Sequence, residues 1–327
     1  MRPAHHRLGG AATLAAALLL GGCSAGAPAD DSSSSSAPVA AEPAIARDFP
    51  DPDVLRDGDR YIAYATNANR RNVQVAVSVD LEDWEVQSED ALPELPDWVI
   101  PNKTWAPEVA SFAPGEYTMY FTATDAESGR QCIGRAVATD PLGPFASPDD
   151  GMLVCPVDEG GAIDAGVTEV DGAPYLLWKN DGNCCGQDTW LYASPLSADG
   201  SAITGERIPL IKQTEPFEGD LVEAPTLVDR GDALVLLYSA NGYGGDEYAI
   251  GMATAPALAG PWTKREEPFL ATEGSPFRGP GGQDLVEAPD GSLRLVIHSW
   301  NRSYSAREMH VIPAEWTGET GLLLDLP

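Results

Sequence analysis

Histidine is scarce in this sequence, and basic residues are few. The 327 residues include four histidines, two of which stand within the first six positions, so that His298 and His310 remain for the body of the chain. Lysine and arginine number 20 against 50 aspartates and glutamates, which gives a formal net charge of −30. So few histidines exclude most histidine-rich metal centres. The excess of negative charge opposes binding to nucleic acid and to anionic lipid.

Long apolar runs are also rare. One run, residues 11–20, follows two arginines and is too short to span a bilayer comfortably. It leads into Leu20-Gly21-Gly22-Cys23, which resembles a bacterial lipoprotein signal, in which the cysteine is acylated after cleavage. We therefore predict a signal peptide over 1–22, lipidation of Cys23, and a location on the extracellular face of the cell membrane. An ordinary signal peptide with a chance cysteine is the alternative.

A serine-rich stretch separates Cys23 from the rest of the chain. Residues 32–36 are all serine and run into Pro38 and Pro43, a composition typical of a flexible tether. We expect the tether to occupy 23–45 and one folded domain to occupy 46–327. No second apolar run of spanning length occurs in that domain, so we expect contact with the membrane only through the lipid.

Four further cysteines remain, and an even number in an exported chain favours disulfides. Cys132 and Cys155 lie 23 residues apart and are predicted to pair. Cys184 and Cys185 are adjacent, and they either form a vicinal bridge or remain thiols. No Cys-x-x-Cys pair exists, so we predict no zinc site.

A five-fold internal repeat is the most informative feature of the chain. Each unit has an extended segment that ends at a β-branched residue, then a glycine turn, then an apolar run that ends at an aromatic residue or histidine. The β-branched residues are spaced by 55 to 60 positions: Val54, Val109, Val167, Thr226 and Val286. The turns contain Gly58, Gly115, Gly172, Gly231 and Gly291, and the apolar runs end at Tyr64, Tyr120, Trp178, Tyr238 and His298. Three markers with one period indicate five copies of a structural unit.

Units of this length predict a five-bladed β-propeller, an all-β fold. Asp57-Gly58, Asp171-Gly172 and Asp290-Gly291 are hairpin dipeptides, and segments such as 234–238 (LVLLY) are short, apolar and rich in strand formers. About four strands fit into each unit, as in a propeller blade. No 3.6-residue apolar period persists beyond the signal peptide, and a solenoid would need shorter repeats.

Carboxylates recur at one position of this repeat. The first strand of each propeller blade lines the central axis, so equivalent positions converge at one end of the tunnel. Three residues before each β-branched marker stand Asp51, Ala106, Asp164, Glu223 and Gln283. We predict that Asp51, Asp164 and Glu223 share one structural position and meet across a single funnel.

Converging carboxylates suit acid–base catalysis. They repel one another, so some of their pKa values must rise, and a protonated acid and an ionised base can then coexist near neutral pH. A carboxylate pair around a glycosidic bond is the recurrent arrangement in sugar hydrolysis. The alternatives are that the acids cap strand starts or face solvent, and that they bind calcium.

Six short motifs, in order, resemble family 43 of the glycoside hydrolases. They are Phe49-Pro50-Asp51-Pro52-Asp53-Val54, Trp105-Ala106-Pro107-Glu108-Val109, Ala162-Ile163-Asp164, Val222-Glu223-Ala224-Pro225, Gly279-Pro280-Gly281-Gly282-Gln283 and His298-Ser299-Trp300. Each motif alone is weak, whereas all six at blade spacing are specific. The resemblance covers about residues 46–312 and implies a five-bladed propeller that hydrolyses glycosidic bonds with inversion.

The resemblance implies a role for each of the three acids. Asp51 would be the general base that activates water, and Glu223 the general acid that protonates the leaving oxygen. Asp164 would raise the pKa of the acid and orient it. Inversion implies that base and acid lie roughly 6.5–9.5 Å apart, which leaves room for a water between them.

The resemblance also implies residues that contact the sugar. Trp105 is expected to lie against a furanose face, Phe49 to form a pocket wall, and Gln283 and His298 to bind near the tunnel; packing within the fold is the alternative for Phe49, Trp105 and His298. Many members carry a histidine after Gly-Pro-Gly that is tied to a water or a calcium ion. Gly282 and Gln283 stand in that stretch here, so we predict no metal or other cofactor and leave a tunnel calcium open.

These residues favour an inverting hydrolase of α-L-arabinofuranosyl linkages in arabinan or arabinoxylan, acting as a monomer on plant cell-wall polysaccharide. A β-xylosidase of the same family is the nearest alternative. A catalytically idle carbohydrate-binding propeller is another, although such relatives usually lose a catalytic acid and none is lost here. A relative acting on sucrose or fructan would need an Asn-Asp-Pro motif, whereas Pro50 precedes Asp51.

Overall fold

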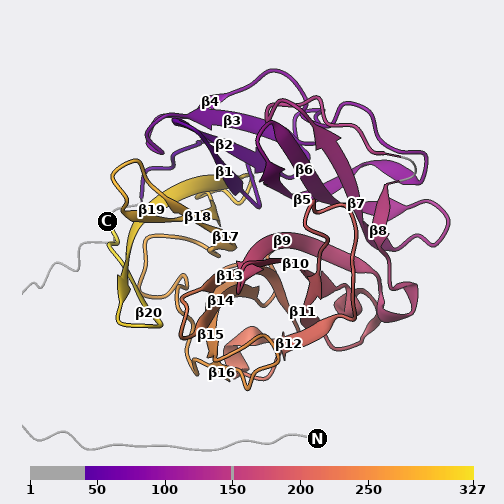
Figure 1. Cartoon of the computed structure of the whole chain (residues 1–327). Coiled ribbons are helices and arrows are strands. Elements are labelled where there is room, and N and C mark those ends of the chain that lie inside the picture. The colour runs from indigo at the N-terminus through magenta and orange to yellow at the C-terminus, as the bar shows by residue number, and fades with distance from the viewer. Residues whose placement is uncertain (1–40, 149–150) are drawn as a thin grey trace, which may run out of the picture. The chain divides into compact units, whose positions relative to one another are not determined.

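The computed structural model describes residues 41–148 and 151–327. These residues form five four-stranded sheets, and in every sheet the strands follow chain order and pair antiparallel with their neighbours. Figure 1 shows the sheets arranged as blades around a centre, with the first strand of each blade innermost. The predicted five-bladed β-propeller is therefore confirmed. Cys23 and the signal peptide lie outside the described residues, so their prediction stands as made.

The blades occupy successive segments of the chain. Blade one contains β1 (Asp53–Asp57), β2 (Arg60–Ala65), β3 (Gln74–Ser78) and β4 (Glu85–Val86). Blade two contains β5 (Val99–Ala113), β6 (Glu116–Asp125), β7 (Gln131–Ala138) and β8 (Met152–Val154). Blade three contains β9 (Ala162–Val170), β10 (Ala173–Asn180), β11 (Trp190–Pro195) and β12 (Ile208–Lys212). Blade four contains β13 (Val222–Asp229), β14 (Leu234–Ala240), β15 (Ala249–Ala255) and β16 (Thr263–Lys264). Blade five contains β17 (Gly281–Glu287), β18 (Leu293–Trp300), β19 (Arg307–Thr317) and β20 (Gly321–Leu324). Three short 3-10 helices lie between strands, namely η1 (Val157–Glu159), η2 (Gly182–Cys185) and η3 (Pro216–Glu218).

The predicted glycine turns join the first two strands of the blades. In blade one, Asp57 pairs with Arg60, so the loop is two residues long. Gly58 in this loop has φ +62°, a left-handed conformation that glycine adopts without the steric cost of a side chain. This turn reverses the chain so that β2 returns toward the end of the propeller where β1 begins.

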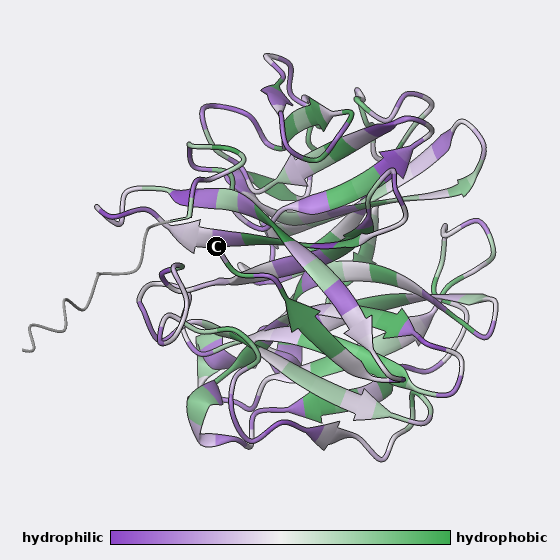
Figure 2. Ribbon diagram, turned by 90° about the vertical axis from the view of Figure 1, so that its left-hand side faces the viewer, coloured by the Kyte–Doolittle hydropathy of each residue, from purple (hydrophilic) through white to green (hydrophobic). Residues whose placement is uncertain are grey.

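The hydrophobic core lies between the blades. Each of five clusters of buried side chains joins one pair of adjacent blades, including the pair formed by blades five and one. Strand β14, for example, is buried along its whole length because a neighbouring blade packs on each of its faces. Figure 2 shows the hydrophobic residues concentrated in the strands and the hydrophilic residues more often in the loops. Burial of both faces explains why the strands are continuously apolar rather than alternating.

The start of the described chain closes the ring of blades. The backbone N–H of Ala44 donates to the carbonyl of Met309 at 2.9 Å, and that of Phe49 donates to Arg307 at 2.9 Å. Ile45 bridges to Met309 in β19. Pairing with blade five therefore begins at residues 44 and 45, slightly before the expected start of the domain at residue 46.

Two disulfides occur among the described residues. Cys132 in β7 is joined to Cys155 just after β8, the pairing that the sequence predicts. Cys184 is joined to Cys185 within η2, so these adjacent residues form a vicinal bridge. In the described part of the chain, no helix has the length and apolar character needed to cross a membrane.

Candidate active site

One residue in or just before the inner strand of each blade adopts a left-handed backbone conformation. These residues are Asp51 (φ 54°), Ala106 (φ 41°), Asp164 (φ 56°), Ala224 (φ 48°) and Gly282 (φ 55°). Such a conformation is uncommon for residues other than glycine and turns the chain sharply. The five residues hold equivalent positions of the repeat, and all of them line the central channel.

This register corrects one sequence prediction. Asp51 and Asp164 occupy the left-handed position, but Glu223 precedes it by one residue, as Trp105 does in blade two. In blade five, Gln283 follows the left-handed Gly282 by one residue. The error came from the β-branched marker in blade four: Leu227, not Thr226, pairs across its hairpin as Val54 does in blade one. The acid in blade four therefore enters the site from a different backbone position than the other two.

A side chain from the preceding blade holds most of these turns. The backbone N–H of Ala106 donates to Thr66 Oγ1 at 2.9 Å, and that of Asp164 to Thr122 Oγ1 at 3.1 Å. Gly282 and Asp51 donate in the same way to Ser239 and His298. These four acceptors occupy equivalent places near the end of the second strand in four of the blades.

Blade three departs from this pattern because the equivalent residue is Lys179. An ammonium group has no acceptor, so the N–H of Ala224 donates instead to Oδ2 of Asp164, at 3.0 Å. Lys179 is left to face Glu223, with its Nζ 3.1 Å from Oε2. The lysine at this position of the repeat thus leads to two contacts between blades three and four, one from Lys179 to Glu223 and one from Ala224 to Asp164.

The three predicted acids line one open cleft. Asp51, Asp164 and Glu223 surround a volume of about 520 Å³ together with Trp105, Lys179, Asp181, Tyr248 and Arg307. The loops after β10 and β14 form part of its rim. The volume is within the range typical of small-molecule sites, so the cleft is large enough for a sugar unit.

Asp51 lies beside a fixed positive charge. Arg307 Nη1 is 3.2 Å from Oδ1 of Asp51, and Thr66 Oγ1 donates to its Oδ2 at 2.6 Å. Burial raises the pKa of Asp51, but the charge of Arg307, with contributions from His298 and the Thr66 hydrogen bond, outweighs it, so the pKa is lowered. Asp51 is therefore an ionised carboxylate at neutral pH, as a general base must be.

His298 supports the backbone of Asp51. Its Nδ1 accepts the N–H of Asp51 at 3.0 Å, which places the ring proton on Nε2. Burial, and then the charge of Arg307, lowers the pKa of His298 to about 3. The imidazole is thus neutral when Asp51 is ionised, so Arg307 supplies the charge that stabilises Asp51.

Glu223 is held by two donors. Tyr248 donates from its hydroxyl to Oε1 at 2.8 Å, and Lys179 approaches Oε2 at 3.1 Å. Lys179 is fully buried and also lies 3.7 Å from Asp181 Oδ1, so a second carboxylate is within reach of its charge. Tyr248 fits because Gly281 has no side chain: a Cβ there would lie 2.1 Å from the tyrosine ring.

Asp164 has the opposite electrostatic character to Asp51. Burial, and next the charge of Glu223, raises its pKa well above the usual range, and Lys179 opposes this only in part. Two carboxylates in one cleft therefore differ in protonation preference because one has a guanidinium beside it and the other has a carboxylate. This separation is what a general acid–base site requires.

The predicted substrate-binding residues divide into two groups. Trp105 lines the cleft. Phe49 is fully buried in the cluster between blades five and one, so it is not a pocket wall. Gln283 and His298 are also buried: Gln283 bonds to Ala224 and Ser239, and His298 bonds to Asp51. Phe49, Gln283 and His298 therefore support the site from within the core between blades and do not line the cleft.

Sequence reasoning missed several residues of the cleft. Arg307, Lys179 and Tyr248 each contact a predicted catalytic acid, and none belongs to a motif. Lys179 could have been noticed in the sequence, because a charged residue near the end of an apolar strand is unusual. Arg307 and Tyr248 lie at loop ends with no such signal, and only the fold brings them to the acids.

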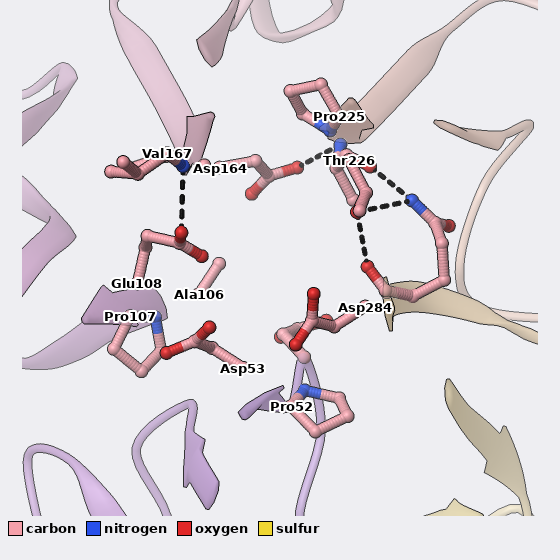
Figure 3. A pocket seen from close by; sticks show the side chains of 16 residues that line it. Pro52, Asp53, Ala106, Pro107, Glu108, Asp164, Val167, Pro225, Thr226 and Asp284 are labelled. Atoms are coloured by element: carbon pink, nitrogen blue, oxygen red, sulfur yellow. Dashed lines mark hydrogen bonds between the residues drawn. The ribbon is translucent and has the colours of Figure 1, made fainter. Parts of the chain in front are cut away.

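A second set of carboxylates lies along the central channel, below the cleft. Asp53, Glu108 and Asp284 stand two residues after the left-handed position and line a cavity of about 70 Å³. Each accepts a backbone N–H from the next blade, those of Val109, Val167 and Val54 respectively. Figure 3 shows the side chains around this channel, including the bond between Glu108 and Val167. Burial is the largest contribution to the raised pKa of all three acids.

Most of the chain matches a known protein family. The model of glycosyl hydrolases family 43 matches residues 40–320. The chain belongs to this family.

Individual relatives agree with this membership. A solved thermostable family 43 glycoside hydrolase has 27% identity and a TM-score of 0.74, over 89% of this chain and 95% of that one. An extracellular endo-α-(1→5)-L-arabinanase of Thermotoga petrophila is 33% identical over 29% of this chain and 22% of its own length. A protein of Xylanibacter ruminicola assigned as a β-xylosidase is 24% identical over 82% of this chain and 48% of its own length. The matches thus span less than half of these two curated relatives.

The histidine that many family members carry after Gly-Pro-Gly has no counterpart at position 282. Within residues 41–148 and 151–327, no group of three or more histidine, cysteine or acidic side chains is arranged to hold a metal ion. At position 282, where the resemblance implies a histidine, a Cβ would lie 2.6 Å from Nδ1 of His298. A side chain at this position would displace His298 from Asp51, so we derive no step through a metal.

Proposed function

We propose that this family 43 protein hydrolyses α-L-arabinofuranosyl linkages in arabinan or arabinoxylan, with inversion at the anomeric carbon. The observation that carries the proposal is the contrast between Asp51 and the pair Asp164–Glu223 in one cleft. Arg307 keeps Asp51 ionised, whereas burial and the charge of Glu223 raise the pKa of Asp164. A base and an acid can therefore act together.

In the proposed reaction Asp51 is the general base. It takes a proton from a water molecule as the oxygen attacks the anomeric carbon. Arg307 and Thr66 fix the direction of its two oxygens, and His298 fixes its backbone. The carboxylate therefore loses little freedom when it binds the water.

Glu223 is the proposed general acid, which donates a proton to the leaving oxygen. Both of its oxygens accept hydrogen bonds in the free protein, so one donor must yield when the proton is carried. Lys179 can turn toward Asp181, which already lies 3.7 Å away. Asp164 orients Glu223 by accepting the N–H of Ala224. After burial, the charge of Glu223 is the next influence that raises the pKa of Asp164.

The proposed sugar specificity is argued from the curated relatives. The arabinanase of T. petrophila is the more identical of the two curated relatives reported above, and it favours an arabinan substrate. A β-xylosidase is the alternative, because the X. ruminicola relative matches most of this chain. An idle binding propeller is disfavoured because all three acids are present in one cleft.

We also propose that the protein acts outside the cell, anchored by lipid at Cys23. The Leu20–Cys23 sequence supports the anchor, and the name of the T. petrophila relative supports an extracellular site. Cys23→Ser should release the protein from membranes. Membrane association that survives this change would contradict the anchor.

Hydrolysis of a substrate panel tests the proposed activity. The panel contains 4-nitrophenyl α-L-arabinofuranoside, 4-nitrophenyl β-D-xyloside, linear arabinan and arabinoxylan, with Asp51→Asn as the inactive control. We expect the arabinofuranosyl substrates to be cleaved fastest and NMR to detect the inverted anomer first. Cleavage of the xyloside alone would favour the alternative, and no cleavage above the control would overturn the hydrolase.

A further inference from the structure

Two half-exposed tyrosines stand together beside the cleft. Tyr243 is 53% exposed and Tyr304 is 39% exposed, and they are the exposed large aromatic side chains of the described residues. They lie on adjacent loops, after β14 and after β18. Trp300 joins them: its Nε1 donates to the carbonyl of Tyr243 at 2.7 Å, and its ring lies 6.0 Å from that of Tyr304. We call Tyr243, Trp300 and Tyr304 the aromatic rim.

Each exposed ring is backed by an arginine. The guanidinium of Arg307 lies 4.8 Å from the ring centre of Tyr243, and that of Arg278 lies 5.4 Å from that of Tyr304. Arg307 is itself fixed by its ion pair with Asp51. A cation on one face holds each ring in place, so the rings are oriented before any ligand arrives.

The backbone of Tyr304 is strained. Its φ is +53°, a left-handed conformation that costs a side chain with a Cβ about 1 kcal/mol or more. Asn301 maintains the turn by accepting the N–H of Tyr304 through its carbonyl and that of Ser305 through Oδ1. Glycine or asparagine would fit this position with less strain. The hydroxyl of Tyr304 donates to Oδ1 of Asp246, so this contact fixes the side chain while part of its ring stays exposed.

The two loops of the rim can approach because Gly279 lies between them. A Cβ at Gly279 would stand 2.4 Å from the carbonyl oxygen of Gly245 and 3.3 Å from Cδ1 of Trp300. The rim is also continuous with the cleft, since Tyr243 and Arg307 line the cleft that contains Asp51 and Glu223. A polymer bound across the acids would therefore meet the rim as it leaves the cleft.

We propose that the aromatic rim binds a sugar unit of the polysaccharide beyond those at the cleaved bond, by stacking on the exposed ring surfaces. This inference rests on the proposed hydrolysis of arabinofuranosyl chains. Sugar rings have apolar faces that pack on flat aromatic side chains. The rim should lower KM for longer substrates and contribute little to kcat, because it lies away from the reacting atoms.

The test compares Tyr304→Asn with Tyr304→Phe. Asparagine suits the left-handed backbone and removes the ring, whereas phenylalanine keeps the ring. The KM values for linear α-1,5-arabino-oligosaccharides of four to six units are divided by the KM for 4-nitrophenyl α-L-arabinofuranoside. We expect Tyr304→Asn to raise this ratio about 5- to 10-fold, with kcat on the oligosaccharides nearly constant. Tyr304→Phe should restore the ratio to within about 2-fold of the wild-type value.

Leu323→Ala removes an exposed apolar side chain from the outermost strand of the same blade and is the matched control for surface changes. If oligosaccharides are cleaved but Tyr304→Asn leaves the ratio unchanged, the rim proposal is wrong while the proposed function survives. If the wild-type protein cleaves no substrate, the proposed function fails. In that case, calorimetric titration of wild-type protein and Tyr304→Asn with the six-unit oligosaccharide tests whether the aromatic rim binds sugar. Weaker binding by Tyr304→Asn supports the proposal, whereas equal affinities or no binding would overturn it.

Discussion

Asp164 binds the backbone directly beside Glu223. Its Oδ2 accepts the N–H of Ala224 at 3.0 Å, and Ala224 follows Glu223 in the chain. In the other blades a residue on the second strand of the preceding blade accepts the corresponding N–H, but Lys179 occupies that place here. Asp164 is thus coupled to Glu223 in two ways, through the repulsion between the two carboxylates, which contributes to the raised pKa of Asp164, and through the position of the backbone.

Substitutions at Asp164 should separate these two effects. Asp164→Asn retains an oxygen that can accept the N–H of Ala224 but removes the charge. Burial and the charge of Glu223 raise the pKa of Asp164, so the wild-type pair of carboxyls should keep a proton to higher pH than the single carboxyl of the variant. The alkaline limb of the pH–rate profile should therefore move to lower pH in Asp164→Asn. Asp164→Leu loses both effects and should show a larger fall in kcat, about 10²-fold or more. Profiles of kcat/KM against pH check this, and equal alkaline limbs for wild type and Asp164→Asn would contradict the charge effect.

Arg307 should set the acidic limb of the same profile. Its charge is the main influence that lowers the pKa of Asp51 against the effect of burial. Without it the pKa of Asp51 rises, and the base becomes protonated at a higher pH. Arg307→Met should therefore move the acidic limb upward, so that activity falls more at pH 5 than at pH 7, while Arg307→Lys should retain part of the wild-type profile. An acidic limb that Arg307→Met leaves in place would show that another group holds Asp51 ionised.

The channel carboxylates should make stability depend on pH. Burial raises the pKa of Asp284 to about 6. A carboxyl whose folded-state pKa is raised stabilises the fold fully below its unfolded pKa of about 4 and loses that contribution as pH rises through about 6. Asp284→Asn can still accept the N–H of Val54 and carries no charge. It should be about 2 kcal/mol more stable than wild type at pH 8 and equal to it at pH 4, as measured by urea unfolding. A variant less stable at both pH values would contradict this account.

The fold could be predicted from the sequence because each blade needs the same kinds of residue at the same positions. Glycines such as Gly58 and Gly291 are required by tight turns, and apolar strands are required by packing on both faces. These needs recur with the blade and make the period visible. The family resemblance then placed the three acids, since short motifs mark the entrances of the inner strands.

The remaining parts of the site could not be predicted for an equally physical reason. Arg307 and Tyr248 reach Asp51 and Glu223 from different blades, so no spacing in the chain reports their contact. Phe49 was misread because an aromatic residue near a catalytic acid can face either the cleft or the core. The exact register of Glu223 depends on a bulge between β13 and β14, which a β-branched marker cannot locate to one residue.

The proposed mechanism assigns the base to Asp51 and the acid to Glu223. The most direct test is how strongly the activity of Glu223→Gln depends on the leaving group of the substrate. The measurement is kcat/KM of wild type and Glu223→Gln on aryl α-L-arabinofuranosides whose phenols range from strongly acidic to weakly acidic, and on an arabino-oligosaccharide. Good leaving groups need little protonation, so the variant should lose at most about 10-fold on the most acidic phenol and about 10²–10⁴-fold on the oligosaccharide. An equal loss on all substrates would show that Glu223 is not the general acid.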